Sequence, residues 1–148
     1  MLERSILSTL QNATTSAALH AAYARGRNNG HFADALAVRG MSEVLDRELL
    51  ERSRVVIGEG ERDSAPMLYI GQELGPRSNG EADWTAQWMQ LPMALNKHGQ
   101  RDEPLLLLAA DPLEGTNLVA RGEDGAISVI AGAIVGEGTL LGGIDGYM

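Results

Sequence analysis

Apolar residues recur at helical spacing over the first fifty positions of the chain. Over residues 2–23 they repeat every three or four positions, which predicts an amphipathic helix that stops before Gly26. The segment 26–32 is rich in glycine and asparagine and therefore predicts a loop. A second amphipathic helix is expected over about 33–50, with Asp34 in its first turn.

Short apolar runs in the rest of the chain predict strands. The run 54–57 is β-branched and ends at glycine, and the run 105–110 is continuously apolar, which favours a strand buried on both faces. A further strand, or a strand and a turn, is expected over 67–71. Apolar residues alternate with glycine over 126–143, which predicts an antiparallel hairpin. The polar segment at about 76–103 is interpreted as an insertion with a short helix.

The composition fits one folded domain with an aliphatic core. The chain has 148 residues, of which 44% are hydrophobic, but only one Phe, three Tyr and two Trp. Its 18 glycines indicate turns and close backbone approaches. No shift in composition divides the chain, so residues 1–148 are expected to form a single α/β domain of layered α+β type.

The charge and the missing cysteine exclude several classes of function. A net charge of −8 and a pI near 4.8 argue against binding to nucleic acid or to an anionic membrane, and favour a cation site. Without cysteine there is no disulfide, thiolate catalysis or cysteine-ligated metal, and a cytoplasmic protein is expected. The longest apolar run, 105–110, is far shorter than the roughly 20 residues of a membrane span.

Acidic residues follow two of the predicted strands. Glu59 and Glu61 come after the first, and Asp111 and Glu114 come after the second. Neighbouring strands can deliver these four carboxylates to one point, where their repulsion requires a counter-charge. Oxygen ligands of this kind suit Mg²⁺ or Mn²⁺, and the backbone carbonyl of Leu113, between two of the acids, is a further expected ligand.

The residues Gly115, Thr116 and Asn117 come directly after this acidic motif. If a helix begins there, its free N–H groups and the Thr116 hydroxyl can hold a phosphate beside the metal. A metal next to a phosphate polarises the phosphoryl oxygen and lowers the pKa of an attacking water. The motif therefore predicts hydrolysis of a phosphate monoester.

Each of these signals also has an ordinary structural interpretation. The segment 111–116 would serve as a strand–turn–helix junction, and Glu59 with Glu61 as a solvated acidic turn. Asp34 would be a residue favoured at a helix start by the helix dipole. Only the presence of two acidic motifs together favours the metal site. His31 is a weaker catalytic candidate.

Two long motifs carry a resemblance to a known enzyme family. Residues 57–71, IGEGERDSAPMLYIG, and residues 111–120, DPLEGTNLVA, resemble class II fructose-1,6-bisphosphatases of the cyanobacterial type that also accepts sedoheptulose 1,7-bisphosphate. The resemblance implies hydrolysis of the 1-phosphate of fructose 1,6-bisphosphate, in gluconeogenesis or the Calvin cycle. It also implies the amino-terminal half of the layered sugar-phosphatase fold shared with inositol monophosphatases.

The same resemblance implies roles for individual residues. Asp34 would bind metal or activate the nucleophilic water, and Thr116 would position that water and the phosphate. Glu61 and Asp63 would be acids behind the metal ligands. The acids that would bind the metal directly are Glu59, Asp111 and Glu114.

Two features depart from the family pattern. The stretch Asn29–Phe32 replaces an Asp-Lys-Asn-Thr-like run, so the loop lysine is absent, and Arg27 or His31 would be the nearest replacement cation. The chain is also about half as long as expected for the family. Exposed strand edges and apolar faces follow from that, so a homo-oligomer or a full-length bisphosphatase is the expected partner. The alternative function is a non-catalytic relative that binds metal or phosphate, or regulates such a bisphosphatase.

Overall fold

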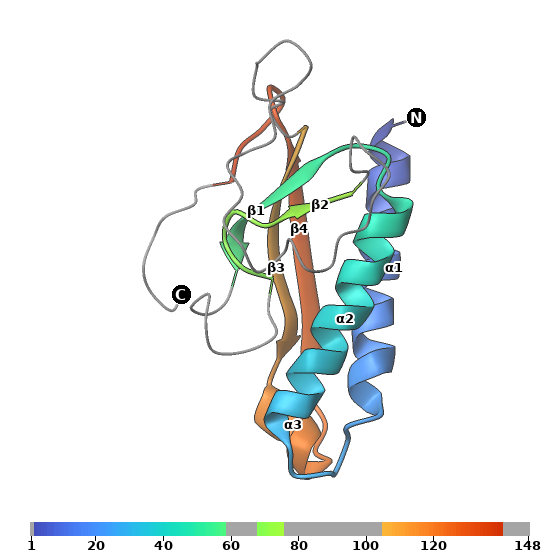
Figure 1. The fold of residues 1–148 in the computed structure, drawn as a ribbon, viewed down its shortest axis with the longest axis vertical. Helices are drawn as coiled ribbons and strands as arrows, with labels where there is room; N and C mark the ends of the chain where they lie inside the picture. Colours follow the sequence, from blue (N-terminus) through green and yellow to red (C-terminus); the bar gives the residue numbers. More distant parts are fainter. Residues whose placement is uncertain (1, 59–67, 76–104, 141–148) are drawn as a thin grey trace.

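Two long helices and a four-stranded mixed sheet make up the computed structural model, which describes residues 2–58, 68–75 and 105–140 (Figure 1). The described part is therefore an α+β structure, as predicted. The whole segment 76–103, where an insertion with a short helix is expected, lies outside the described residues. The elements are α1 (Leu2–Ala22), α2 (Gly30–Glu48), β1 (Ser53–Gly58), β2 (Glu73–Leu74), β3 (Leu106–Glu114), α3 (Thr116–Arg121) and β4 (Ile127–Ile134).

The sheet has the strand order β2-β1-β3-β4. β1 pairs with β3 in parallel, whereas β2 pairs with β1, and β4 with β3, in antiparallel fashion. At the carboxyl end of the parallel pair, Gly58 lies beside Ala110. Because parallel strands end at the same edge of a sheet, the chain leaves β1 and β3 from adjacent points.

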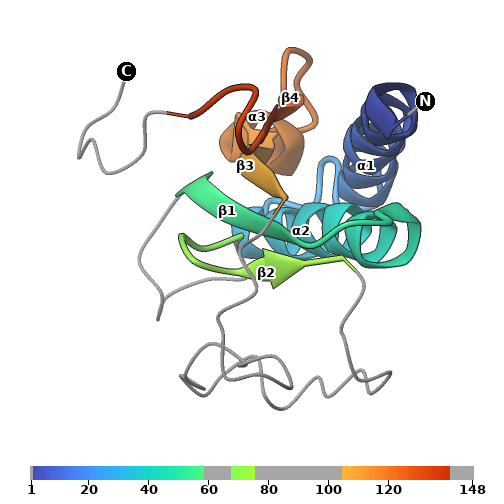
Figure 2. The same cartoon turned by 90° about the horizontal axis from the view of Figure 1, so that it is seen from above.

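Both long helices pack on the same face of the sheet, as Figure 2 shows from above. The core between these layers is aliphatic, as predicted, with Met41, Leu45 and Leu108 fully buried. α1 and α2 approach closely where Gly40 faces His20, because a Cβ at Gly40 would lie 2.6 Å from His20 Nδ1. Among the described helices, none has an apolar stretch of the length that would cross a membrane.

α2 begins earlier than the sequence pattern suggested. Residues 30–32, expected in a loop, form its first turn. The cause is Asn29, whose side-chain oxygen accepts a hydrogen bond from the Phe32 N–H at 3.0 Å and so caps the helix. This cap brings Asp34 to the beginning of a helix that starts near α3.

Two strand predictions needed correction. β3 is buried on one face only: Leu108 is fully buried, whereas its neighbours Leu107 and Ala109 are partly exposed. The described part of 67–71 is a turn, closed by the Gln72 N–H to the Tyr69 carbonyl at 3.0 Å. The first part of the hairpin predicted over 126–143 is β4, which pairs with β3 and is followed by a turn at 136–137, and residues 141–143 lie outside the described residues.

Candidate metal and phosphate site

The acidic motif occupies the end of β3, where the strand continues through Glu114 instead of stopping at Ala110. Its register against β4 shifts between Asp111 and Glu114. Within this irregular stretch, Asp111 Oδ1 accepts a hydrogen bond from the Leu113 N–H at 3.0 Å, which folds the carboxylate over its own strand. Both acids lie at the end of the same strand, but Asp111 is half-buried whereas Glu114 is exposed.

Gly115 makes the sharp turn from β3 into α3. Its φ of 90° lies in the left-handed region, which glycine adopts without a steric cost. A Cβ here would also lie 3.2 Å from the Cα of Ala126. The predicted helix after Gly115 is confirmed, since α3 begins at Thr116.

A hydrogen bond joins the two segments that carry the expected water-activating residues. Thr116 Oγ1 donates to Asp34 Oδ1 at 2.7 Å, and a longer contact of 3.3 Å links the same hydroxyl to the Leu113 carbonyl. Both side chains are half-buried. The fold therefore brings together Asp34 and Thr116, 82 positions apart in the sequence.

Gly30 allows α2 to come this close to α3. A Cβ at this position would lie 2.9 Å from Thr116 Cγ2, so a larger residue would push the two segments apart. The sequence analysis did not single out Gly30. The signal that could have found it is a glycine in the first turn of a helix, four residues before Asp34.

The loop between α1 and α2 is fastened to the far end of α3. The Gly26 N–H donates to the Val119 carbonyl at 2.9 Å, and the Asn28 N–H donates to the Ala120 carbonyl at 2.7 Å. These bonds satisfy carbonyl groups that a helix end leaves without partners. A Cβ at Gly122 would lie 3.4 Å from the Gly26 Cα, so the backbones pass closely. Both ends of α3 are therefore hydrogen-bonded to the start of α2 or to the loop before it.

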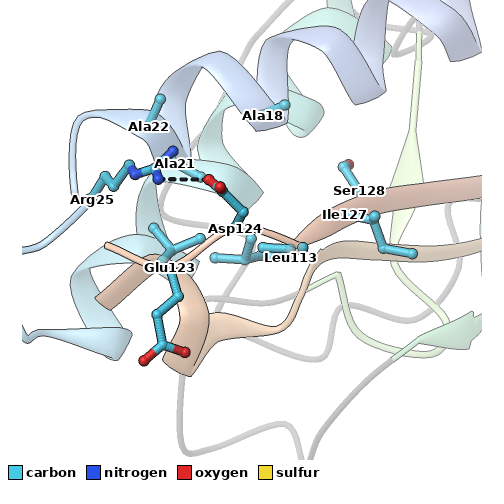
Figure 3. A pocket seen from close by; sticks show the side chains of 12 residues that line it. Ala18, Ala21, Ala22, Arg25, Leu113, Glu123, Asp124, Ile127 and Ser128 are labelled. Carbon is cyan, nitrogen blue, oxygen red and sulfur yellow. Dashed lines mark hydrogen bonds and ion pairs between the residues drawn. The ribbon is translucent and has the colours of Figure 1, made fainter. Parts of the chain in front are cut away.

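A cavity of about 440 Å³ lies on the other side of this junction, between α1 and the segment that links α3 to β4 (Figure 3). Arg25 spans its rim, with Nη2 2.6 Å from Asp124 Oδ1 and 2.9 Å from the Gly122 carbonyl. Of the expected site residues that the structure describes, Leu113 alone lines the cavity. The cavity is therefore distinct from the Asp34–Thr116 pair.

The donors at this site have the chemistry of a hard-cation site, but the described residues hold only part of it. Asp34, Asp111 and Glu114 provide carboxylate oxygens, and the Leu113 carbonyl lies between the last two. Within residues 2–58, 68–75 and 105–140, no three Asp, Glu or His side chains converge closely enough to hold a metal ion. The remaining expected acids, Glu59, Glu61 and Asp63, lie outside the described residues.

Three other candidate residues are placed by the structure. Asn117, expected to bind phosphate, is exposed on α3. His31 is exposed in the first turn of α2, and Arg27 lies with its guanidinium carbon 5.8 Å from the centroid of the Phe32 ring. Neither is bonded to Asp34 or Thr116 in the described structure.

Comparison with known proteins identifies a family. The sequence profile of the bacterial fructose-1,6-bisphosphatases, glpX-encoded, matches residues 4–148. A protein named D-fructose 1,6-bisphosphatase class 2/sedoheptulose 1,7-bisphosphatase from Gloeobacter violaceus is 41% identical over 133 residues, which cover 89% of this chain and 34% of the relative. The protein of the same name from Trichodesmium erythraeum is 40% identical over 132 residues, with the same coverage.

A third relative of that name, from Synechocystis, is 39% identical over 133 residues and is again covered to 34% of its length. The chain thus spans about a third of the length of these relatives. The expectation of about half, made from the sequence alone, underestimated their size.

Proposed function

The chain belongs to the family of glpX-encoded bacterial fructose-1,6-bisphosphatases, and from this premise we propose that it carries the metal and phosphate site of a sugar bisphosphatase. The proposed reaction is hydrolysis of the 1-phosphate of fructose 1,6-bisphosphate, with sedoheptulose 1,7-bisphosphate as a second substrate. Both sugars occur in the names of the relatives. Mg²⁺ or Mn²⁺ is the proposed cofactor and the cytoplasm the proposed location. Residues 1–148 would form the amino-terminal domain of a fold like that of inositol monophosphatases.

The pairing of β1 with β3 supports the proposed metal ligands. Gly58 lies beside Ala110, and Glu59 and Asp111 are the next residues in the sequence. We propose that these two acids bind the metal together with Glu114 and the Leu113 carbonyl, with Glu61 and Asp63 as acids behind them. The metal would polarise the phosphoryl group and lower the pKa of the attacking water.

The observation that carries the proposal is the hydrogen bond from Thr116 to Asp34. Because the Thr116 hydroxyl donates its hydrogen bond to Asp34, its oxygen lone pairs remain available to accept a hydrogen bond from a water. That water would transfer a proton to Asp34 while its oxygen attacks phosphorus. The bond from phosphorus to the sugar oxygen then breaks, and the sugar alkoxide takes a proton from solvent.

The start of α3 supports a phosphate position next to this pair. Gly115, at the N-cap, has no side chain that could cap the first N–H groups of the helix. We propose that backbone N–H groups of Gly115, Thr116 and Asn117 bind oxygens of the transferred phosphate. Such donors would also stabilise the negative charge that grows on those oxygens in the transition state.

Phosphate release from fructose 1,6-bisphosphate with Mn²⁺ tests the proposal. Asp34→Asn should lower the rate by about a hundredfold or more, because the base is lost. Thr116→Val should lower it about tenfold, whereas Thr116→Ser, which keeps the hydroxyl, should retain most of the activity. Asp124→Asn is the matched control, since the Asp124 side chain is 91% exposed and lies outside the site. Equal rates in Asp34→Asn and wild type would refute the assigned role.

A second candidate function is supported by the start of α2. Residues 29–32, where the family lysine is expected, form a helix cap and a helical turn, and Gly30 there has no room for a side chain beside Thr116. The alternative is a non-catalytic relative that binds metal or phosphate and associates with a full-length bisphosphatase. It is favoured if the purified chain releases no phosphate while fructose 1,6-bisphosphate still raises its Tm.

A further inference from the structure

The Arg25 side chain joins the end of α1 to the far end of α3. Its Nε and Nη2 both donate to the Gly122 carbonyl, at 3.2 and 2.9 Å, and Nη2 also lies 2.6 Å from Asp124 Oδ1. Gly122 is the residue that caps α3, with a φ of 79°. Figure 3 shows the guanidinium meeting Asp124 in the segment that follows α3. Arg25 therefore links two segments that lie 97 positions apart in the sequence.

Arginine is suited to this contact in a way that lysine is not. Two N–H groups of one planar guanidinium converge on a single carbonyl oxygen, so both the distance and the orientation of the carbonyl are restrained. A lysine ammonium bonds as a point charge on a flexible stem and does not restrain the orientation. The contact with Asp124 contributes less, because the Asp124 side chain is 91% exposed and that of Arg25 is 53% exposed. The restraint on α3 therefore comes from the bonds to the Gly122 carbonyl.

Two backbone bonds hold α3 to the same loop, but they leave its tilt free. They reach the carbonyls of Val119 and Ala120, which are adjacent in the sequence. Two neighbouring attachment points still allow a helix to tilt about the line that joins them. The bonds from Arg25 attach α3 at a third point, the Gly122 carbonyl, and this third point opposes the tilt.

The start of α3 responds to the position of its end because the helix is short. α3 has six residues, so it is about 9 Å long and moves as one body. Gly115 and Gly122, both in the left-handed region, form its two ends. At the start, Thr116 Oγ1 donates to Asp34 Oδ1 at 2.7 Å, and a hydrogen bond weakens steeply when its geometry is distorted. A tilt of α3 would therefore displace the Thr116 hydroxyl from Asp34.

We infer that Arg25 is a positioning residue for the proposed reaction, because its bonds to Gly122 hold α3 at the tilt that the hydrogen bond at its start requires. The inference rests on the proposed function, in which the attacking water is held between Thr116 and Asp34. Arg25 acts on that pair through α3 and not through contact with the substrate. Its replacement should therefore lower the rate only as far as the Thr116 hydroxyl contributes to it.

Phosphate release at saturating fructose 1,6-bisphosphate with Mn²⁺ tests the inference in a double-mutant cycle. Arg25→Ala should lower kcat about fivefold, less than the loss of about tenfold expected from Thr116→Val, because the hydroxyl is displaced and not removed. In the Thr116→Val background the same substitution should have no further effect. Arg25→Lys should behave like Arg25→Ala, whereas Asp124→Asn, which removes only the ion pair, should leave kcat unchanged. Arg39→Gln is the matched control, because it removes another exposed guanidinium together with its ion pair, to Glu43 at 2.7 Å.

Equal losses from Arg25→Ala in the two backgrounds would overturn the inference, because a general loss of folded protein lowers both rates alike. A loss in Asp124→Asn as large as that in Arg25→Ala would overturn it as well, since the ion pair would then account for the effect.

Urea unfolding of the same full-length variants tests the geometry without catalysis. Thr116→Val should lower the urea midpoint of the wild type, because the hydrogen bond to Asp34 is lost. In the Arg25→Ala background this shift should be about half as large or smaller, since the bond is already distorted, and in the Arg39→Gln background it should be unchanged. Equal shifts in all three backgrounds overturn the inference. If the wild type releases no phosphate, the proposed function fails, and this cycle alone decides whether Arg25 positions α3.

Discussion

The α2–α3 junction and the outer edge of β4 differ in whether their hydrogen-bonding groups have partners among the described residues. At the junction, contacts within the chain hold the segments together: Thr116 donates to Asp34, and the loop before α2 donates to the carbonyls at the end of α3. At the edge of β4, the outward groups have no partner strand among the described residues. The segments of the junction therefore bond to one another within the described residues, whereas the outer groups of β4 have no partner strand there.

The two regions differ in how far the described residues satisfy one another's contacts. The hydrogen bond between Thr116 and Asp34 joins only α2 and α3, so the proposed water activation rests on described residues. By contrast, Ile127 on β4 is 55% exposed and Val129 is 46% exposed within the described residues. Substitutions at the junction should therefore act both on stability and on the proposed catalysis.

The largest expected difference in stability is between alanine substitutions at two glycines of similar backbone conformation. Gly115 at the junction has φ 90° and Gly136 beyond β4 has φ 91°, so alanine at either position costs about 1–2 kcal/mol of backbone strain. At Gly115 the new Cβ also meets Ala126 and Leu118 at 3.1–3.4 Å, which adds about 1–2 kcal/mol, whereas at Gly136 it meets nothing within 4 Å. Urea unfolding should show Gly115→Ala as clearly less stable. Equal losses would mean that the junction is not tightly packed.

A smaller effect should appear at the contact between Gly30 and Thr116. Gly30→Ala places a Cβ 2.9 Å from Thr116 Cγ2, and should lower the free energy of unfolding by about 1 kcal/mol. Thr116→Ser removes that methyl group and keeps the hydroxyl. In the serine background, Gly30→Ala should become neutral or stabilising, because alanine is favoured over glycine in a helix. A double-mutant cycle by urea unfolding should therefore give a coupling of about 1 kcal/mol, and additive effects would contradict the contact.

The sequence predicted those parts of the fold that follow from local pattern. The helices over 2–23 and 33–50, the strand over 54–57 and the helix after Gly115 all appear, because apolar periodicity and glycine act locally. The partial exposure of β3 could not be predicted, since it depends on which layers cover the sheet. The start of α2 was predicted three residues too late because Asn29, expected in a loop, acts as a helix cap.

The sequence predicted which residues belong to the candidate site, but not the contacts that hold its segments together. Asp34 and Thr116 were each expected to handle water, and the structure joins them by a hydrogen bond. Gly30 had only one local signal, a glycine in the first turn of a helix, and the hydrogen bond from Gly26 to Val119 had none, because it joins segments distant in sequence. The metal ligands stay a prediction, since Glu59 lies outside the described residues.

The opposite edge of the sheet shows how a protected edge differs from β4. β2 has two residues only, and its Glu73 bonds to Arg52 Nη2 at 2.9 Å and to Arg54 Nη2 at 3.1 Å. A short strand with charged side chains resists pairing with another chain. Partial burial acts to raise the pKa of Glu73, but the hydrogen bonds and positive charges of the two arginines outweigh it, so its pKa is lowered.

The smallest effect we expect is therefore a pH-dependent one at Glu73. Because its pKa is lower in the folded state, Glu73 stabilises the fold above the unfolded value of about 4.3, and this contribution is lost as the pH falls through the folded value. Glu73→Gln should lower the free energy of unfolding by under about 1 kcal/mol at pH 7, since the side chain is 38% exposed. In urea unfolding the difference from wild type should shrink toward about pH 3. Glu137→Gln, exposed beyond β4, is the control. A difference that persists unchanged at low pH would show that Glu73 acts through packing, and the charge-protected edge would then lose its physical basis.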